Sequence, residues 1–329
     1  MMKVLVTGVG GQLGRDVMNE LARRGYEGTG SDLAPVYSGI ADGSPVIRMP
    51  YVSLDITDAE AVERVISDLR PDAVVHCAAW TAVDLAEDDD QAAKVYAVNV
   101  DGTGYIAQAC LKYDAKMLYL STDYVFDGQG TEPWKPDCRD YRPLNIYGKT
   151  KLAGELAVSG LLKKYFIVRI AWVFGLNGKN FLKTILQVGK THDTVRVVTD
   201  QIGTPTYTFD LARLLVDMIE TERYGYYHAT NSELPEQASV TDGQGRRTGY
   251  TADGTKTGYI SWYDFTREIY RQAGCGAQVI PVTTAEYGLS KAKRPMNSRL
   301  DKTKLAENGF APLPVWTDAV GRYLKEMNR

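Results

Sequence analysis

Apolar and polar positions in the first half of the chain follow a pattern that predicts alternating strands and helices. Residues 3–8 form a short run rich in β-branched side chains that ends in glycine, which is typical of a strand buried in a parallel sheet. Residues 12–24 carry leucine and valine at helical spacing and predict an amphipathic helix. A second strand is expected over residues 26–31, with Asp32 at its end.

The alternation continues to about residue 175 and predicts the fold class. Further strands are expected over residues 51–55, 73–79, 117–122 and 166–170, and further helices over 58–69, 91–113 and 147–155. This order is typical of an α/β protein with a Rossmann-type, doubly wound parallel sheet. We expect this first domain over residues 1–175, with some later segments returning to it. A smaller C-terminal lobe is expected, mainly over residues 176–329.

One segment of the expected lobe has an unusual composition. Residues 233–258 are polar, rich in glycine and threonine, and nearly free of aliphatic side chains. Such a segment cannot bury enough apolar surface to build a core of its own. We therefore expect it to be either a mobile surface insertion or a small polar hairpin.

Three glycines between the first strand and the first helix predict a dinucleotide site. Gly8, Gly11 and Gly14 are spaced by three, which lets the backbone approach a pyrophosphate held at the helix N-terminus. Asp32 lies about 20 positions further on, where an acidic residue of such a fold binds the ribose hydroxyls. A carboxylate there repels a 2′-phosphate, so NADH is slightly favoured, while NADPH use stays open.

Tyr147 and Lys151 are four residues apart, so on a helix they share one face. A lysine ammonium beside a phenol favours the phenolate, and we therefore expect it to lower the pKa of Tyr147 toward neutrality and make it an acid or base. Thr122 ends an expected strand and could hydrogen-bond the same substrate oxygen. The alternatives are a solvated lysine beside a half-buried tyrosine, a Thr122 hydroxyl bonded to backbone, and Asp123 capping a turn.

Composition excludes several function classes. The 329 residues carry a net charge of −3, which gives no electrostatic basis for binding nucleic acid or an anionic membrane. No apolar run approaches the roughly 20 residues of a membrane span, and the N-terminus enters a strand without a signal peptide pattern. The four cysteines are widely spaced and predict neither disulfides nor a metal site. We expect a cytoplasmic protein.

Several segments together carry a resemblance to a known family. They are residues 7–14, 78–84, 121–128, 147–155, 200–206 and 294–300. On these segments nearly the whole chain resembles the extended short-chain dehydrogenase/reductases, and within them the dTDP-4-dehydrorhamnose reductases. The glycine turn and the Tyr147–Lys151 pair mark the superfamily in general, whereas the runs at 121–126 and 294–298 are much narrower.

The resemblance implies an activity with defined catalytic residues. The reaction is reduction of the 4-keto group of dTDP-6-deoxy-L-lyxo-4-hexulose to dTDP-L-rhamnose, with NADH or NADPH. Tyr147 is the implied proton donor. Lys151 is implied as its tuner and as a ligand of the nicotinamide ribose, and Thr122 takes the place of the usual catalytic serine or threonine.

The resemblance also implies two sets of binding residues. The cofactor set is Gly8, Gly11, Gln12, Leu13, Asp32, Asp55, Ile56, Ala78, Ala79, Trp80, Asn99, Ser121, Tyr147 and Lys151. The substrate set is Thr122, Asp123, Trp172, Asn180, Arg294 and Asn297. For Trp172, packing in a core is an equal alternative.

The chain departs from the family pattern at several places. Trp80 stands where tyrosine or histidine is common, and residues 35–50 and 233–258 are longer than usual. Some members form dimers through magnesium and C-terminal glutamates, but residues 300–304 are rich in lysine here. The resemblance therefore leaves a monomer or a homodimer open and implies no metal site.

Two other functions stay open. The first is a nucleotide-sugar epimerase or dehydratase on the same fold. A dehydratase needs an acid/base pair of carboxylates after the hydroxyl residue, but Tyr124 follows Asp123. The second is a regulatory subunit that binds the cofactor without catalysis, against which the presence of Tyr147, Lys151 and Thr122 argues.

Overall fold

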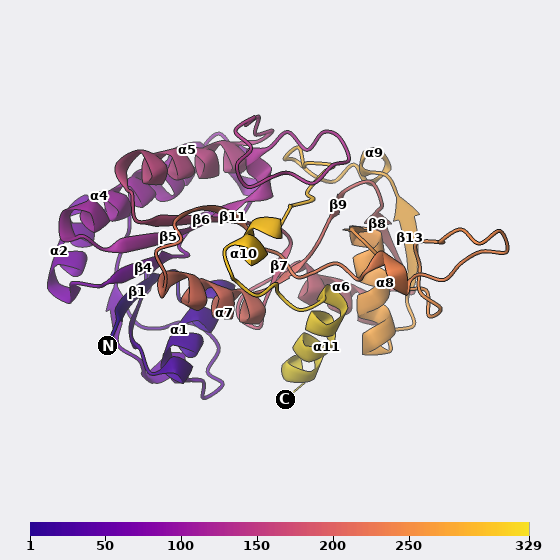
Figure 1. The fold of residues 1–329 in the computed structure, drawn as a ribbon, viewed down its shortest axis with the longest axis horizontal. Coiled ribbons are helices and arrows are strands. Elements are labelled where there is room, and N and C mark those ends of the chain that lie inside the picture. The colour runs from indigo at the N-terminus through magenta and orange to yellow at the C-terminus, as the bar shows by residue number, and fades with distance from the viewer. Residues whose placement is uncertain (329) are drawn as a thin grey trace.

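The computed structural model describes residues 1–328, and within them one parallel sheet dominates the molecule (Figure 1). The sheet has seven strands in the order β11-β6-β5-β4-β1-β2-β3. The strands are β1 (Lys3–Thr7), β2 (Glu27–Asp32), β3 (Tyr51–Ser53), β4 (Ala73–His76), β5 (Lys116–Thr122), β6 (Tyr165–Ile170) and β11 (Gly225–His228). This arrangement confirms the predicted Rossmann-type, doubly wound α/β fold.

The strand order reverses between β1 and β4. From β1 the chain proceeds outward to β2 and β3, and it then returns to pair β4 with the other side of β1 in parallel. The ends of the two central strands meet where Thr7 pairs with His76. In open α/β sheets the crevice outside the carboxyl ends at such a switch point is where ligands bind.

Helices cover both faces of the sheet (Figure 1). On one face lie α2 (Ala59–Leu69), α4 (Thr103–Tyr113) and α5 (Ile146–Leu161). On the other face lie α1 (Gln12–Arg24) and α7 (Thr208–Ile219). Both layers bury the apolar faces of their helices against strand residues, and this burial is the main source of stability of the fold.

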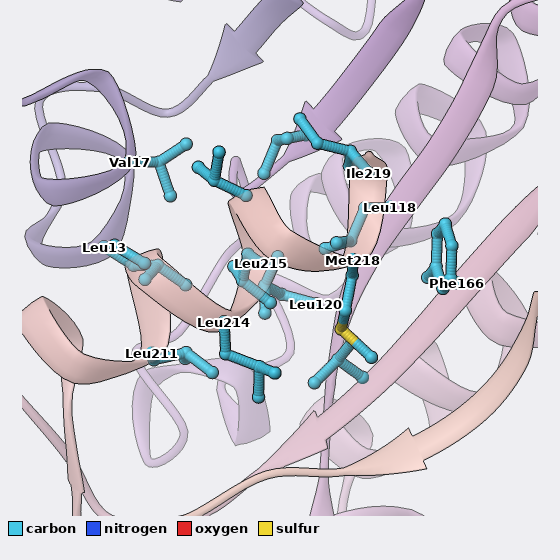
Figure 2. Packing of buried hydrophobic residues seen from close by; sticks show 14 of the residues in the cluster. Leu13, Val17, Leu118, Leu120, Phe166, Leu211, Leu214, Leu215, Met218 and Ile219 are labelled. Carbon is cyan, nitrogen blue, oxygen red and sulfur yellow. The ribbon is translucent and has the colours of Figure 1, made fainter. Parts of the chain in front are cut away.

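The core between α1, α7 and the sheet is continuous (Figure 2). Leu13 and Val17 come from α1, Leu215 and Met218 come from α7, and Leu118 comes from β5. The residues that the sequence pattern placed on the apolar face of the first helix therefore pack in this core. Leu13 was also predicted at a cofactor position, but its buried side chain leaves only its backbone to face a ligand.

The helix predicted over residues 91–113 is interrupted. It consists of α3 (Ala92–Tyr96), the π-helical segment η3 (Ala97–Gly102) and α4. The wider π turn contains Asn99, whose side chain is buried. Such π segments are frequent at functional sites, because they redirect a side chain that a regular helix would point elsewhere.

A second group of elements packs around its own apolar cluster. The longer elements are α6 (Phe181–Thr191), β8 (Thr194–Val198), α8 (Trp262–Ala273), β13 (Gln278–Val282) and α11 (Trp316–Met327). The shorter ones are β7 (Val173–Phe174), β9 (Ile202–Gly203), β10 (Thr206–Tyr207), β12 (Ile260–Ser261), α9 (Thr284–Tyr287) and η5 (Glu236–Ala238). The remaining short helices lie with the large sheet: η1 (Pro45–Arg48) packs on α1, α10 (Thr303–Glu307) lies against β11, and η2 (Leu85–Glu87) and η4 (Asp123–Val125) contact α5. Phe265 and Trp316 are central to the cluster.

Among residues 1–328, none of the helices is both long and apolar enough to cross a membrane.

Residues 233–258 form a polar hairpin that projects from this second group (Figure 1, orange). Isolated bridges pair Leu234 with Gly258 and Tyr250 with Lys256. The segment is not wholly at the surface, because Thr255 is buried and its hydroxyl donates to a carboxylate oxygen of Glu268 in α8 at 3.1 Å. Of the two predicted alternatives, the structure has the hairpin. The division of the chain at residue 175 stays a prediction.

Candidate active site

The glycine-rich turn packs closely against the ends of the central strands. Gly8 has a φ of +74°, and a Cβ placed there would lie 2.6 Å from the backbone nitrogen of Ala78. A Cβ at Gly14 would lie 2.3 Å from the carbonyl oxygen of Gly8. Gly11 is the N-cap of α1 and offers no side-chain cap, so the first amides of the helix are open to an anion. The turn therefore fits a dinucleotide pyrophosphate.

Asp32 lies beside this turn, at the end of β2. One carboxylate oxygen accepts from the Gly10 amide at 2.8 Å, and the other accepts from the Leu33 amide at 2.8 Å. These two bonds hold the half-buried carboxylate in place next to the glycines. The structure thus brings the predicted ribose ligand and the predicted pyrophosphate turn together.

Five further residues predicted to bind the cofactor follow β4 or β3. Ala78 lies against Gly8, and its amide donates to the Thr7 hydroxyl at 3.2 Å. Ala79 and Trp80 follow, and both are half-buried. Asp55 is exposed and Ile56 is buried, and both lie after β3.

Asn99 links the segment after β4 to α5. Its side-chain oxygen accepts from the Trp80 amide at 2.8 Å, and its amide nitrogen donates to the Trp80 carbonyl at 3.2 Å and to the Thr150 hydroxyl at 3.1 Å.

Ser121, near the end of β5, has a buried hydroxyl with no partner among residues 1–328. An unpartnered buried hydroxyl is costly, so this atom fits a ligand.

The start of α5 is anchored at its N-terminus. Asn145 is the N-cap and accepts from the Gly148 amide at 2.8 Å, and Glu87 accepts from the Ile146 amide at 2.7 Å. A Cβ at Gly148 would lie 2.3 Å from the carbonyl oxygen of Tyr124, so the helix packs tightly against the segment after β5. This packing places Tyr147 beside the carboxyl end of the sheet.

Thr122 and Asp123 end β5 at the same place. The Thr122 hydroxyl donates to Asp123 at 3.0 Å and accepts from the Tyr124 amide at 3.2 Å, so it caps the short helix η4. The alternative of a strand-end hydroxyl bonded to the backbone is therefore present in the structure. Asp123 is buried and also accepts from the Ser298 hydroxyl, and burial raises its pKa to about 6.

The expected effect of Lys151 on Tyr147 is wrong for this structure. Burial raises the pKa of Tyr147, the nearby Thr122 hydroxyl partly opposes this, and the charge of Asp123 adds to it. Burial also lowers the pKa of Lys151 itself to about 7. The ammonium of Lys151 lies over the ring of Tyr119 instead. A protonated phenol is the form that donates a proton, so the raised pKa of Tyr147 suits a reduction.

Trp172 is held by aromatic neighbours. It has a φ of +50°, in the left-handed region that is unusual for a bulky residue. Its ring stacks on the ring of Trp262, with centroids 3.9 Å apart. Phe181 in turn packs on Trp262, with centroids 4.4 Å apart. The ring of Trp172 therefore packs against other aromatic side chains, as one of the two alternatives predicted. Its side chain is only half-buried, and a contact with substrate stays a prediction.

Asn180 and Asn297 have structural partners. Asn180 is the N-cap of α6, and its amide donates to the side chain of Gln12 at 2.9 Å. The Asn297 amide donates to the carbonyl oxygens of Glu132 at 2.9 Å and Gln129 at 3.2 Å. Both amides are thus already hydrogen-bonded, and their substrate-binding roles stay predictions.

Arg294 forms a two-point ion pair with Asp84, at 2.9 and 2.7 Å. Asp84 is the N-cap of η2, and its partner lies 210 positions away along the chain. A neighbouring contact pairs Lys291 with Asp88. The segment before Asn297 is thereby tied to the loop after β4.

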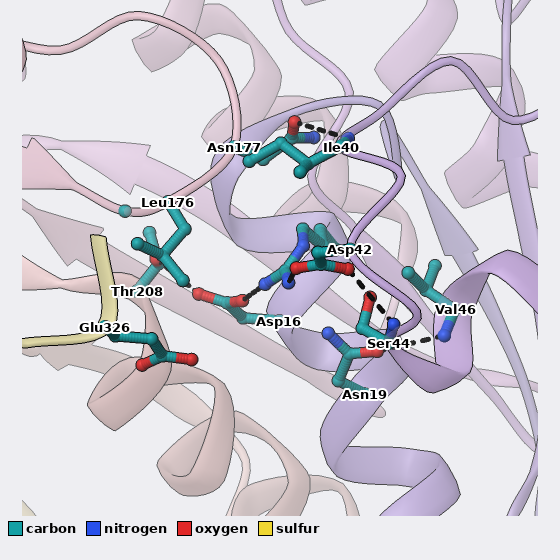
Figure 3. A network of polar contacts seen from close by, with 12 residues as sticks. Asp16, Asn19, Ile40, Asp42, Ser44, Val46, Leu176, Asn177, Thr208 and Glu326 are labelled. Atoms are coloured by element: carbon teal, nitrogen blue, oxygen red, sulfur yellow. Dashed lines mark hydrogen bonds and ion pairs between the residues drawn. The ribbon is translucent and has the colours of Figure 1, made fainter. Parts of the chain in front are cut away.

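Asn177 is a residue that the sequence analysis missed. Its side-chain amide donates to the carbonyl oxygens of Gly10 at 2.7 Å and Gly11 at 3.2 Å. Its oxygen accepts from the Ile40 amide (Figure 3). It therefore joins the glycine turn to the long loop over residues 35–50. An asparagine before glycine reads as an ordinary turn in sequence, so no local signal marks it.

The loop over residues 35–50 is held from α1 as well (Figure 3). Arg15 pairs with Asp16 at 2.7 Å and with Asp42 of the loop, and Asn19 accepts from the Val46 amide at 2.9 Å. A loop of this length would be mobile if its backbone groups had only water as partner. The contacts instead fix it beside the glycine turn.

A glycine turn at the switch point of a parallel sheet, with Tyr147 and Lys151 beside it, defines a Rossmann-type NAD(P)-binding oxidoreductase. The family described as "RmlD substrate binding domain" matches residues 2–242 and 248–329. The chain belongs to this family. The unmatched residues between the two ranges lie in the polar hairpin.

Individual relatives agree over nearly the full length. The chain is 35% identical over 326 residues to the spore coat polysaccharide biosynthesis protein SpsK of Bacillus subtilis (strain 168), covering 99% of this chain and 98% of the relative. It is 35% identical over 320 residues to dTDP-4-dehydrorhamnose reductase of Aggregatibacter actinomycetemcomitans, covering 93% of each. The crystal structure of dTDP-4-dehydrorhamnose reductase from Bacillus anthracis in complex with NADP superposes with a TM-score of 0.82, at 34% identity and 99% coverage of each chain.

Proposed function

We propose that this protein reduces the 4-keto group of dTDP-6-deoxy-L-lyxo-4-hexulose to dTDP-L-rhamnose, as a dTDP-4-dehydrorhamnose reductase. The observation that carries the proposal is the grouping of Tyr147, Thr122 and Asp123 at the carboxyl edge of the sheet, with Lys151 one helical turn from Tyr147. The full-length similarity to reductases of that name supports the choice of substrate.

The residues of the chain supply binding, orientation and a proton. A bound nicotinamide supplies the hydride. Tyr147 donates its phenolic proton to the 4-oxygen of the sugar, and its raised pKa keeps that proton in place at neutral pH. The Thr122 hydroxyl accepts from the Tyr124 amide and donates its single proton to Asp123. With substrate bound, that proton would turn from Asp123 to the sugar 4-oxygen and stabilise the charge developing there. Lys151 binds the nicotinamide ribose and helps to restore the proton.

NADH is the proposed preferred cofactor. The carboxylate of Asp32, held by two backbone amides, accepts hydrogen bonds from a free ribose and repels a 2′-phosphate. The relative from Bacillus anthracis holds NADP in its crystal structure, so the preference is one of degree. The remaining cofactor ligands proposed from the resemblance are backbone and side-chain groups of the glycine turn, residues 78–80, Asn99 and Ser121.

The nucleotide-sugar is proposed to bind between this edge and the lobe mainly over residues 176–329. Trp172 would pack against the sugar, and Arg294 would attract the diphosphate while remaining paired with Asp84. Asn180 and Asn297 would act through the segments that they hold. A cytoplasmic location and a monomeric or homodimeric state stay predictions.

Oxidation of NADH and of NADPH, measured with the keto-sugar made in situ, tests the proposal. We expect turnover by the wild type, with NADH used more efficiently, and a loss of at least a hundredfold in Tyr147→Phe with unchanged NADH affinity. Identification of the product as dTDP-L-rhamnose separates this reaction from reduction to another sugar. Cofactor binding without turnover in the wild type would contradict the assignment.

A further inference from the structure

The side chain of Lys151 is almost wholly buried, and in the described part of the chain no conventional polar partner holds its ammonium. The residue is 3% exposed, and among residues 1–328 its Nζ takes part in no hydrogen bond or ion pair. A cation on a side chain that is this deeply buried is costly unless its surroundings attract the charge. The ammonium lies over the ring of Tyr119 in β5, whose centroid is 4.1 Å away. At this distance the electron-rich face of an aromatic ring attracts a cation.

Tyr119 is itself fixed in position. It is fully buried, and its hydroxyl donates to the backbone carbonyl of Lys151 at 3.2 Å. The ring of His76 stacks against it with centroids 5.9 Å apart, and the His76 ring nitrogens contact Thr7 and Thr103. These contacts hold the Tyr119 ring in its observed orientation toward α5.

A glycine in α5 leaves the space that this orientation needs. A Cβ at Gly154 would lie 2.3 Å from the hydroxyl oxygen of Tyr119. The helix that carries Tyr147 and Lys151 thus packs directly on the ring. The close approach of strand and helix brings the ring within reach of the Lys151 ammonium.

The other titratable groups around Lys151 supply little direct support for its charge. They are Glu155 and Tyr147 on α5, His76 and Cys77 at the end of β4, and Tyr119 on β5. The Glu155 carboxylate favours the ammonium but is committed to Arg169, at 2.7 and 2.8 Å. Burial keeps His76 and the Cys77 thiol uncharged near neutrality, with pKa values of about 3 and about 12.

We propose that Tyr119 is a positioning residue for the reduction, whose ring face holds the Lys151 ammonium beside the cofactor crevice and favours its charged form. The proposal rests on the role proposed above for Lys151. Only the ammonium has a proton to pass on and three donors to offer to a ribose and a phenol. The sequence pattern predicts no more for Tyr119 than a core residue of a buried strand.

A series of fluorinated phenylalanines at position 119 tests the proposal. Fluorine withdraws electrons from the ring face with little change of shape, so Phe, 4-fluoro-, 3,5-difluoro- and 3,4,5-trifluorophenylalanine weaken the attraction stepwise. The measurement is kcat against pH with NADH and the keto-sugar. Tyr119→Phe keeps the ring face but loses the hydroxyl, and it is the reference with which the fluorinated variants are compared. We expect the basic limb of the profile to move stepwise to lower pH, by about one pH unit in total, with unchanged NADH affinity.

Titration of the Lys151 Nζ followed by NMR gives the same shift without turnover. A basic limb and a Lys151 titration that do not move along the series would overturn the proposal. Loss of activity in Tyr119→Phe as large as in the trifluoro variant would also overturn it, because the hydroxyl and not the ring face would then matter. Lys151→Met separates the two proposals, since wild-type activity in that variant contradicts the role of Lys151 whatever the series shows.

Discussion

Gly14 and Gly104 offer a matched test of the close approach between α1 and the glycine turn. Both glycines lie in helices, so replacement by alanine at either position should stabilise the helix by about 0.5–1 kcal/mol. A Cβ at Gly104 meets nothing within 4 Å. A Cβ at Gly14 would lie 2.3 Å from the Gly8 oxygen and 2.9 Å from the Val9 Cα, which are rigid backbone atoms.

The clash at Gly14 should outweigh the gain in helix propensity. Forcing an extra methyl group into a packed site costs about 1–3 kcal/mol, so Gly14→Ala should lose about 1–2 kcal/mol of unfolding free energy overall. Gly104→Ala should gain about 0.5 kcal/mol. Because α1 must move away from the turn, NADH affinity should fall at least tenfold in Gly14→Ala and stay unchanged in Gly104→Ala.

Urea unfolding gives the two free energies, and fluorescence titration gives the two NADH affinities. Equal stability and equal NADH affinity of the two variants would refute the reasoning. A stable Gly14→Ala with weak NADH binding would show that the helix accommodates the methyl group by displacing the turn. In that case the packing argument would hold for the cofactor but not for the fold.

Three further predictions concern charged groups. Glu155→Gln should lose about 3–5 kcal/mol of unfolding free energy, measured in urea, because it leaves Arg169 buried without its counter-charge. Asp114→Asn, at the exposed pair with Lys164, should lose less than about 1 kcal/mol. Similar losses in the two variants would contradict this. The pKa of Asp123 is raised from 3.8 to about 6, so the folded state binds the extra proton and the unfolding free energy falls as pH rises through this window. Asp123→Asn should therefore become more stable relative to wild type between pH 4 and 7, by up to about 3 kcal/mol, and a constant difference in urea unfolding would refute it. Asp32→Asn should raise kcat/KM for NADPH relative to NADH by at least about tenfold, and an unchanged ratio would remove Asp32 as the selective group.

The sequence by itself determined the fold class, six of the seven strands of the large sheet and the cofactor turn, whereas β11 and the order of the strands came from the structure. The periodicity of residues 12–24 predicted α1 at its observed bounds, and Asp58 marked the start of α2 as its N-cap. The spacing of Gly8, Gly11 and Gly14 located the turn. Such features are local, because a strand, a cap or a tight turn depends on neighbours within a few positions.

The helix over residues 91–113 shows a limit of local patterns. Its extent was predicted, but the π turn around Asn99 was not, because the wider turn is stabilised by contacts from Asn99 to Trp80 and Thr150 rather than by the spacing of its own residues. The helical pattern in sequence is the same for both geometries. The side chain that the π turn redirects is therefore visible only in the folded molecule.

Only the tertiary structure decided which charges meet and what their protonation is. Asp84 forms an ion pair with Arg294, and Asp123 accepts a hydrogen bond from Ser298. Asn177, from the second half of the chain, donates to the glycine turn. The sequence placed Lys151 beside Tyr147 by helical spacing, but its ammonium lies on the ring of Tyr119. A pKa depends on burial and on every group that packs nearby, and both are properties of the assembled sheet and helices rather than of residue spacing.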